Sequence, residues 1–377
     1  MIPVNEPVIS SKAKKYILEC LKTGWVSSGG EYISKFEKEF ARFIGTKYAV
    51  TTTSGTSALH LAFAALGIKK GDEVIMPDLT IISCALAVIY LGAKPVFVDV
   101  ESDTGNIEPL QIEAKITKRT KAVLVVHLFG HPANIGDIKK ITNKHNLYLV
   151  EDAAQAHGAK YLLNNKWQAV GSVGDVSCFS FYGNKIVTSG EGGMLTTNNI
   201  NIAKKARLLK DLAHSPKRRF LHEHLGYNYR MTNLQAALGV AQLENIQRYL
   251  LKKRLIANFY NKNLKQIGWL ELPTEKPWAK SVFWMYAVKI KKGSKINKFS
   301  VMKKLKNEGI DTREFFLPLH KQPIISKLNI KSSGSFLNTV DLSKRGFYVP
   351  SGLALTTKQM QKVVSAFQKI SHGQKSN

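Results

Sequence analysis

At 377 residues the chain is too long for one ordinary hydrophobic core, and its 44% hydrophobic and 22% charged residues are typical of a soluble globular protein. It has no apolar run near the roughly 18 residues of a membrane helix and no secretory signal pattern, which argues against a membrane or secreted protein. The net charge of +28 fits nucleic-acid binding, attraction of a multiply charged anionic substrate, or lysines on solvated helix faces. The lysines are spread along the chain without a nucleic-acid-binding motif, which favours solvated helix faces.

The three cysteines, Cys20, Cys84 and Cys178, are odd in number and far apart in the sequence. This pattern predicts reduced, mostly buried thiols in a cytoplasmic protein. It does not match the spacing of a metal site.

The N-terminal elements expected are a helix at 8–23, a helix at 31–44 that Gly45 ends, and a short strand at 48–51. The two helices are separated by a turn-rich stretch at 24–30, which carries an exposed aromatic side chain, Trp25.

A small polar turn at 52–57 follows the strand at 48–51 and precedes a strongly apolar helix at 58–66. A strand, a small turn and a helix together bind phosphate, because free backbone N–H groups and the positive helix end face the anion. A cluster of serine and threonine before a helix is also an ordinary N-cap, and on its own the turn favours the cap. The turn matches neither a Walker P-loop nor the dinucleotide-binding glycine pattern.

An alternation of strands and helices runs from residue 73 to residue 152. The strands are expected at 73–76, 95–100, 122–128 and 148–152, and the helices at 82–91, 110–116 and 138–145. This rhythm predicts an α/β fold whose central sheet is mostly parallel and is covered by helices on both faces. Ligands of such sheets bind at the carboxyl ends of the strands, where Asp152 lies.

Two apolar strand-like runs, at 176–181 and 194–197, flank Lys185 and a cluster of glycines at 190–193. Glycines allow a sharp turn and a close approach to a ligand. A lysine between such strands would be partly desolvated, which lowers its pKa and favours nucleophilic attack on a carbonyl. The alternative is a solvated lysine on a surface hairpin.

The remainder of the chain changes character after a helix that starts at 234 and continues beyond 249. The segment 281–290 alternates like strands, and helices are expected near 300–308 and 358–370. We therefore expect a large α/β domain at 1–250 and a smaller C-terminal α+β domain at 251–377.

Pyridoxal phosphate needs three anchors in a protein: a lysine for its aldehyde, an anion for its pyridinium nitrogen and donors for its phosphate. The chain offers Lys185, Asp152 and the turn at Gly55-Thr56 in a suitable α/β context. Each signal is weak or moderate alone, but the three together predict a pyridoxal-phosphate site.

The chain resembles the DegT/StrS family of nucleotide-sugar aminotransferases over nearly its whole length. The stretches that carry the resemblance are 151–158, 180–185, 190–193, 226–237 and 241–243. The resemblance implies the aspartate aminotransferase fold, known as fold-type I, with glutamate as amino donor and shared active sites in a homodimer. Shorter stretches, at 24–28, 130–132, 218–223 and 312–320, resemble the members that aminate C4 of GDP-4-keto-6-deoxy-mannose.

The resemblance also implies roles for residues of this chain. Lys185 would be the catalytic lysine, which binds the cofactor and moves the proton, and Asp152 would pair with the pyridinium nitrogen. Gln155 would contact the hydroxyl side of the ring. The phosphate would be held by Gly55, Thr56 and Ser180, and by Asn228 of a second subunit.

Four residues are candidates for the substrate side: Trp25, Arg219, Arg230 and His320. The basic stretch 217–219 is the densest in the chain, so we expect the diphosphate near Arg218 or Arg219, unless the stretch is only a solvated loop. Where the family often stacks an aromatic side chain on the cofactor ring, this chain has Ile81, so we expect an aliphatic side chain there.

Three other functions are considered. One is an aminotransferase acting on a UDP- or dTDP-linked 3- or 4-keto sugar. Another is a related dehydratase, but those enzymes carry histidine at the position of Lys185. The third, a basic nucleic-acid-binding protein, would leave the pairing of Lys185 with Asp152 unexplained.

Overall fold

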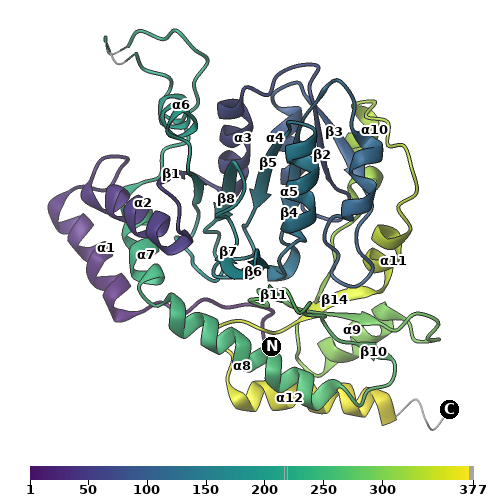
Figure 1. Cartoon of the computed structure of the whole chain (residues 1–377). Coiled ribbons are helices and arrows are strands. Elements are labelled where there is room, and N and C mark those ends of the chain that lie inside the picture. The colour runs from purple at the N-terminus through teal and green to yellow at the C-terminus, as the bar shows by residue number, and fades with distance from the viewer. Residues whose placement is uncertain (216, 219, 373–377) are drawn as a thin grey trace.

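The computed structural model describes residues 1–215, 217–218 and 220–372, and its centre is a seven-stranded sheet of order β1-β9-β8-β5-β4-β2-β3 (Figure 1). Neighbouring strands are parallel except at β9, which runs antiparallel to both β1 and β8. The strands are β1 (Tyr48–Thr52), β2 (Glu73–Pro77), β3 (Lys94–Val98), β4 (Thr120–Val126), β5 (Tyr148–Asp152), β8 (Val176–Ser180) and β9 (Gly193–Thr197). The mostly parallel sheet expected from the sequence is confirmed.

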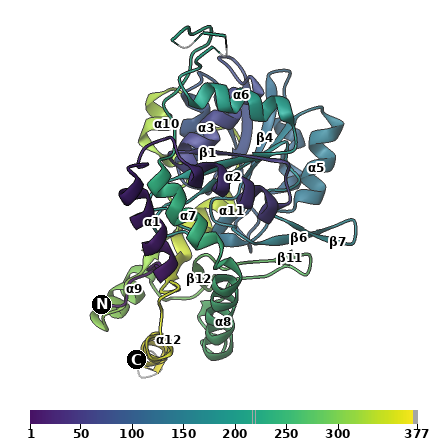
Figure 2. The ribbon, with the colours of Figure 1, turned by 90° about the vertical axis from the view of Figure 1, so that its left-hand side faces the viewer.

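Helices cover both faces of this sheet (Figure 2). Successive side chains of a strand point to opposite faces, and β4 follows this rule: Val123 and Val125 join one hydrophobic cluster, and Leu124 joins the other. The first cluster includes residues of α2, α5 and α7, and the second includes residues of α3, α4 and α6. The helices of this part are α1 (Ser11–Thr23), α2 (Glu31–Ile44), α3 (Gly55–Leu66), α4 (Ser83–Ile89), α5 (Ile135–Lys144), α6 (Ile200–Lys210) and α7 (Asn233–Leu243).

A second, antiparallel sheet of order β10-β12-β14-β13 forms the C-terminal part together with helices and its own hydrophobic cluster. Helices α8 and α12 pack against each other beside it (Figure 1). The strands are β10 (Leu270–Glu271), β12 (Tyr286–Ile290), β13 (Arg313–Glu314) and β14 (Gly346–Val349). The helices are α8 (Ile246–Leu264), α9 (Lys298–Asn307), α10 (Pro323–Lys327), α11 (Leu337–Arg345) and α12 (Thr357–His372).

Helix α8 connects the two parts without a break. Its first turns place Ile246 and Tyr249 in the core of the large sheet, and its later turns place Ile256 and Tyr260 in the core of the small one. The expected boundary between residues 250 and 251 falls inside this helix. We therefore propose that the two domains meet within α8.

The structure differs from the sequence-based expectation in several elements. The helix expected at 110–116 is two short 3₁₀ turns, η1 (Pro109–Gln111) and η2 (Glu113–Lys115), because Leu110 points into solvent and the apolar face is incomplete. Within 281–290 only Tyr286–Ile290 is a strand. The short sheet of β6 (Lys160–Leu163), β7 (Lys166–Ala169) and β11 (Ala279–Lys280) was not expected. No helix of the described residues is long and apolar enough to cross a membrane.

Candidate active site

The turn between β1 and α3 presents free backbone donors. Ser54 caps α3, since its side chain accepts from the N–H of Ser57 and Ser57 reaches back to the N–H of Ser54. Among the described residues, the N–H groups of Gly55 and Thr56 donate no hydrogen bond. These two donors at the positive end of a helix are suited to an anion.

The start of β9 brings the segment after β8 against this turn. A Cβ atom on Gly193 would lie 2.1 Å from the carbonyl oxygen of Ser54, so only glycine allows the approach. A Cβ atom on Gly55 would lie 2.8 Å from Cβ of Ser180. The hydroxyl of Ser180 is therefore next to the free N–H groups of α3.

Lys185 lies half-buried in the segment between β8 and β9, where its N–H donates to the carbonyl of Tyr182 at 2.9 Å. Its Nζ lies 3.9 Å from the centre of the Trp284 indole ring. Burial lowers the pKa of Lys185 to about 8, against a smaller, opposing effect of the Asp152 charge. About a tenth of Lys185 is therefore an uncharged amine at pH 7.

Asp152 ends β5 and is buried beside the same segment. Its Oδ1 accepts from the N–H of Ala154 at 3.0 Å, and its Oδ2 accepts from the thiol of Cys84 at 3.2 Å. Burial raises the pKa of this carboxyl, whereas these hydrogen bonds and the nearby Lys185 charge act in the opposite direction. A protonated ring nitrogen would be a suitable partner for such a carboxylate.

Gln155 follows on the loop after β5. Its Oε1 accepts from the N–H of Phe129 at 2.6 Å, where the backbone of Phe129 has a positive φ of 52°. With its oxygen occupied, the amide nitrogen of Gln155 is the group left to meet a ligand.

These residues line one cavity of about 320 Å³, a size that suits a small-molecule cofactor. Asn184 also lines it and has a buried Oδ1 without a hydrogen-bond partner among the described residues. Ile81 lies on the cavity wall and is 43% exposed. The cavity is lined by Ser54, Gly55, Thr56, Leu59, Ile81, Ser83, Asp152, Ala154, Gln155, Cys178, Ser180, Tyr182, Asn184, Lys185, Glu191, Trp284, Phe316 and Tyr348.

Three predicted residues do not reach this cavity within one chain. Asn228 is exposed and accepts from Nε of Arg230 at 3.1 Å, and Arg230 pairs with Asp211 at 2.9 Å. Both lie on the segment that follows α6, where Asn228 pairs with Asp211 at the end of that helix. Trp25 is 60% exposed beside Asn233 at a separate surface hollow.

His320 also lies outside the Lys185 cavity. Its Nδ1 lies 2.5 Å from Oδ2 of the buried Asp78, and its ring stacks on Phe336. It lines an open groove and not the Lys185 cavity. Arg219 lies outside the described residues, so its predicted contact with the diphosphate stays a prediction.

The DegT/DnrJ/EryC1/StrS aminotransferase family matches residues 7–368. The chain belongs to this family. GDP-perosamine synthase of Caulobacter vibrioides is 40% identical over 370 residues, covering 98% of each chain. GDP-perosamine synthase of Vibrio cholerae is 39% identical over 363 residues, covering 96% of this chain and 97% of the relative. Among solved structures, S. venezuelae DesV has a TM-score of 0.89 at 32% identity, covering 96% and 94% of the two chains.

The family membership confirms three expectations: the fold of the pyridoxal-phosphate aminotransferases known as fold-type I, the transaminase class, and pyridoxal phosphate as the cofactor. The donor set of the cavity fits this cofactor. The N-terminus of α3 with Ser180 would hold the phosphate, Asp152 the ring nitrogen and Lys185 the aldehyde carbon. Gln155 would meet the ring from the side, and Ile81 would cover it.

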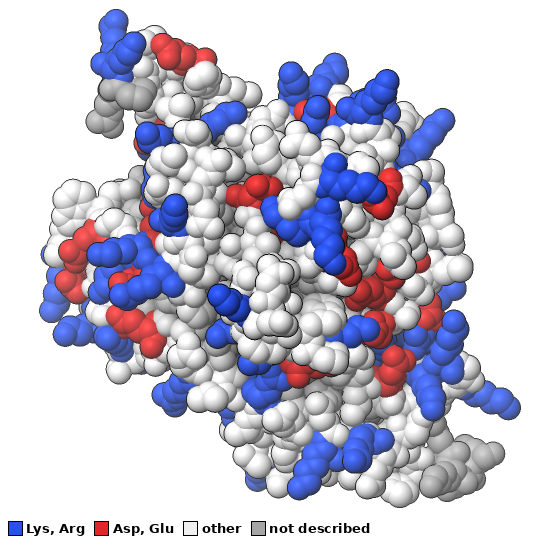
Figure 3. Space-filling model, in the orientation of Figure 1, with Lys and Arg blue, Asp and Glu red and all other residues white. Residues whose placement is uncertain are grey.

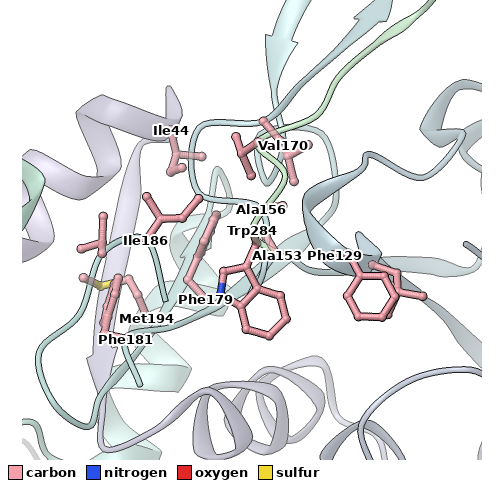
Figure 4. Close-up of a cluster of buried hydrophobic side chains, with 14 of the residues drawn as sticks. Ile44, Phe129, Ala153, Ala156, Val170, Phe179, Phe181, Ile186, Met194 and Trp284 are labelled. Atoms are coloured by element: carbon pink, nitrogen blue, oxygen red, sulfur yellow. The ribbon is translucent and has the colours of Figure 1, made fainter. Parts of the chain in front are cut away.

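The structure adds side chains that the sequence did not single out. Trp284 comes from the C-terminal part, about 100 residues after Lys185, and gave no signal beyond strand-like alternation. Figure 4 shows it in one hydrophobic cluster with Ala153, Ala156 and Phe179. Cys84 looked like an inert buried thiol, and its contact with Asp152 could not be read from a cysteine count.

Proposed function

We propose that the chain transfers the amino group of L-glutamate to C4 of GDP-4-keto-6-deoxy-D-mannose, giving GDP-perosamine and 2-oxoglutarate. The observation that carries this proposal is the 40% identity to GDP-perosamine synthase of Caulobacter vibrioides along 98% of both chains. The half-buried amine of Lys185, beside a buried carboxylate, supports the chemistry.

When bound, pyridoxal phosphate supplies an aldehyde that accepts the amino group and a ring that withdraws electrons from the carbon losing a proton. Lys185, uncharged in part near pH 7, would take that proton and deliver it to the second carbon bonded to the nitrogen that is transferred. Asp152 keeps the ring nitrogen protonated. The indole ring of Trp284 lies over the lysine amine, with its centre 3.9 Å from Nζ.

The high positive charge fits two anionic substrates. On the face shown in Figure 3, lysines and arginines are spread among acidic residues and do not form one continuous basic surface. A net positive charge attracts anions such as glutamate and a nucleotide diphosphate.

The test is a panel of GDP-, UDP- and dTDP-linked 3-keto and 4-keto sugars, each supplied with L-glutamate. We expect turnover with the GDP-linked 4-keto-6-deoxy-mannose, an amino sugar by mass spectrometry and an equal amount of 2-oxoglutarate. The Lys185→Ala protein is the control and should give neither product. Turnover confined to UDP- or dTDP-linked sugars would contradict the substrate and leave the aminotransferase class intact.

We further propose a homodimer in which Asn228 reaches the phosphate site of the second subunit. In support, Asn228 is exposed on the segment after α6 and does not line its own chain's cavity. The same segment carries the exposed apolar side chains Leu212, Leu221 and Leu225, which a second copy would cover.

We also propose a cytoplasmic location. The support is that Cys20, Cys84 and Cys178 are all free and buried, as is typical of a reducing compartment.

A further inference from the structure

The position of Trp284 depends on contacts at both ends of the residue. Its indole N–H donates to the carbonyl of Asn184 at 2.7 Å, which ties the ring to the residue before Lys185. The amide of Asn5 donates to the same carbonyl at 2.6 Å. The backbone carbonyl of Trp284 accepts from Nζ of Lys253, at 2.8 Å.

Lys253 is a buried cation without an acidic partner. It is 2% exposed, and its Nζ also donates to the carbonyl of Ser351, at 2.5 Å. No carboxylate among the described residues lies within ion-pair distance of it. Buried ammonium groups are rare unless paired, so two neutral carbonyls are an unusual environment for this side chain.

Several ionisable groups lie on the elements around Lys253, and none of them neutralises it. The next residue on α8, Arg254, pairs with Glu275 at 2.7 Å. The phenol of Tyr260 on α8 donates to the carbonyl of Pro350, and the phenol of Tyr286 on β12 donates to Oδ1 of Asn261. Burial raises the pKa of both phenols. Lys185 lies over the ring of Trp284, at the other end of that residue.

We propose that Lys253 is a positioning residue, which holds the Trp284 backbone so that the indole ring stays over the amine of Lys185. Lys253 lies on α8, which packs in both hydrophobic cores, so it joins the C-terminal part to the cofactor segment. Ser351 provides the second acceptor of Lys253. Its hydroxyl oxygen accepts from the N–H of Tyr286, and its N–H donates to the carbonyl of Val4. The ammonium therefore joins three separate segments at one point behind the active site.

The hydrogen bonds need a charged donor to be strong, and burial lowers the pKa of Lys253 to about 7. Below that pH the ammonium holds both carbonyls, and above it the amine holds them more weakly. The position of Trp284 should therefore respond to pH near 7, separately from the titration of Lys185. The inference depends on Lys185 as the cofactor lysine and not on which sugar is the substrate.

The test uses the full-length, cofactor-loaded protein labelled with 5-fluorotryptophan and followed by ¹⁹F NMR. The Trp284 resonance is assigned by its loss in Trp284→Phe. We expect it to shift with pH around a midpoint near 7. The shift should vanish in Lys253→Met and persist in Lys252→Met, a matched change at the preceding residue.

The half-reaction with L-glutamate, followed by the visible absorbance of the cofactor, gives a second readout. In Lys253→Met we expect its maximal rate to fall about tenfold with little change in the glutamate concentration for half-maximal rate, since a displaced group slows chemistry more than binding. Lys253→Arg should restore the rate and abolish the titration, because arginine stays charged.

If Lys253→Met does not fold, Lys253→Arg decides the question, with Lys252→Arg as its control. A Trp284 resonance that titrates in Lys253→Arg as in the unchanged protein would overturn the inference. So would an unchanged half-reaction rate in a folded Lys253→Met protein. A failure with the GDP-linked sugar would alter neither readout, so the two proposals fail separately.

Discussion

The chemistry of a single amine depends here on where its side chain is placed. Because the pKa of Lys185 is lowered from 10.5 to about 8, the amine form makes up about a tenth of the side chain at pH 7 and half of it at pH 8. For a free lysine the amine form at pH 7 would be about a thousandth or less. Burial thus increases the reactive form by more than a hundredfold.

We predict that the rate at which the cofactor-free protein takes up pyridoxal phosphate covalently rises with pH, with a midpoint near 8. The reason is that the uncharged amine attacks the aldehyde and the ammonium does not. The measurement is the growth of the visible absorbance band after mixing at each pH. Lys185→Ala should show no band, whereas the exposed Lys166→Ala should behave as the unchanged protein. A midpoint above pH 10 would contradict the effect of burial.

Two adjacent carboxylates show what the sequence could and could not reveal about the site. Asp152 is a candidate from the sequence because it ends a buried strand, and the structure places it in the same cavity as Lys185, whereas its role stays a prediction. Its neighbour Glu151 points to the other face, where it accepts from the N–H groups of Gly171 and Gly174 at 2.9 and 2.6 Å and holds a loop. The contacts of Trp284 and Lys253 join segments that are far apart in the sequence. A local sequence pattern cannot predict such contacts.

At the scale of elements, the turn between β1 and α3 depends on a missing side chain. We predict that Gly55→Ala weakens the binding of pyridoxal phosphate about tenfold, or about 1.4 kcal/mol. A Cβ atom there would lie 2.8 Å from Cβ of Ser180, so the turn or the serine must move away from the phosphate site.

Titration of the cofactor-free protein with pyridoxal phosphate, followed by absorbance, measures this effect. Gly268→Ala is the matched control, because a Cβ atom on Gly268 meets nothing within 4 Å. Both variants should keep the far-ultraviolet circular dichroism of the unchanged protein. Equal affinities in the two variants would mean that the phosphate does not bind at this turn.

The elements that the sequence revealed are those with a clear apolar period. The parallel strands are continuous apolar runs and the amphipathic α2 repeats its phenylalanines on one face, so both could be located. The β6–β7 hairpin was not predicted, because only Tyr161 of its strand residues is buried and the sequence has no alternating pattern there. At 110–116 the sequence has apolar residues, but Leu110 is exposed and Pro109 starts only a short turn.

At the scale of the whole molecule, the proposed dimer makes a prediction about mixtures. Lys185→Ala and Asn228→Asp should each be inactive alone, because one lacks the amine and the other brings a carboxylate to the phosphate. In a hybrid dimer one site carries both changes and the other carries neither. Random exchange of subunits should therefore restore about a quarter of the activity of the unchanged protein. The measurement is the glutamate-dependent turnover after the two proteins are exchanged.

Native mass spectrometry provides the control, since it shows whether hybrids have formed. Hybrids without any recovered activity would contradict a site shared between subunits. Activity in the Asn228→Asp protein alone would show that Asn228 does not contact the phosphate.

The pairing of β1 with β9 affects how the molecule is assembled during synthesis. Tyr48 of β1 is paired with Thr197 of β9. Strand β1 therefore cannot pair with β9 until the ribosome has synthesised the chain to residue 197. Joining such distant segments is slow, because the loop between them must be ordered first. The turn that we expect to bind the phosphate follows β1, and the segment of Lys185 precedes β9. Both halves of the cofactor site should therefore become ordered in the same late step. A nascent chain that has not yet been extended to residue 197 lacks β9 and cannot form the complete cofactor site.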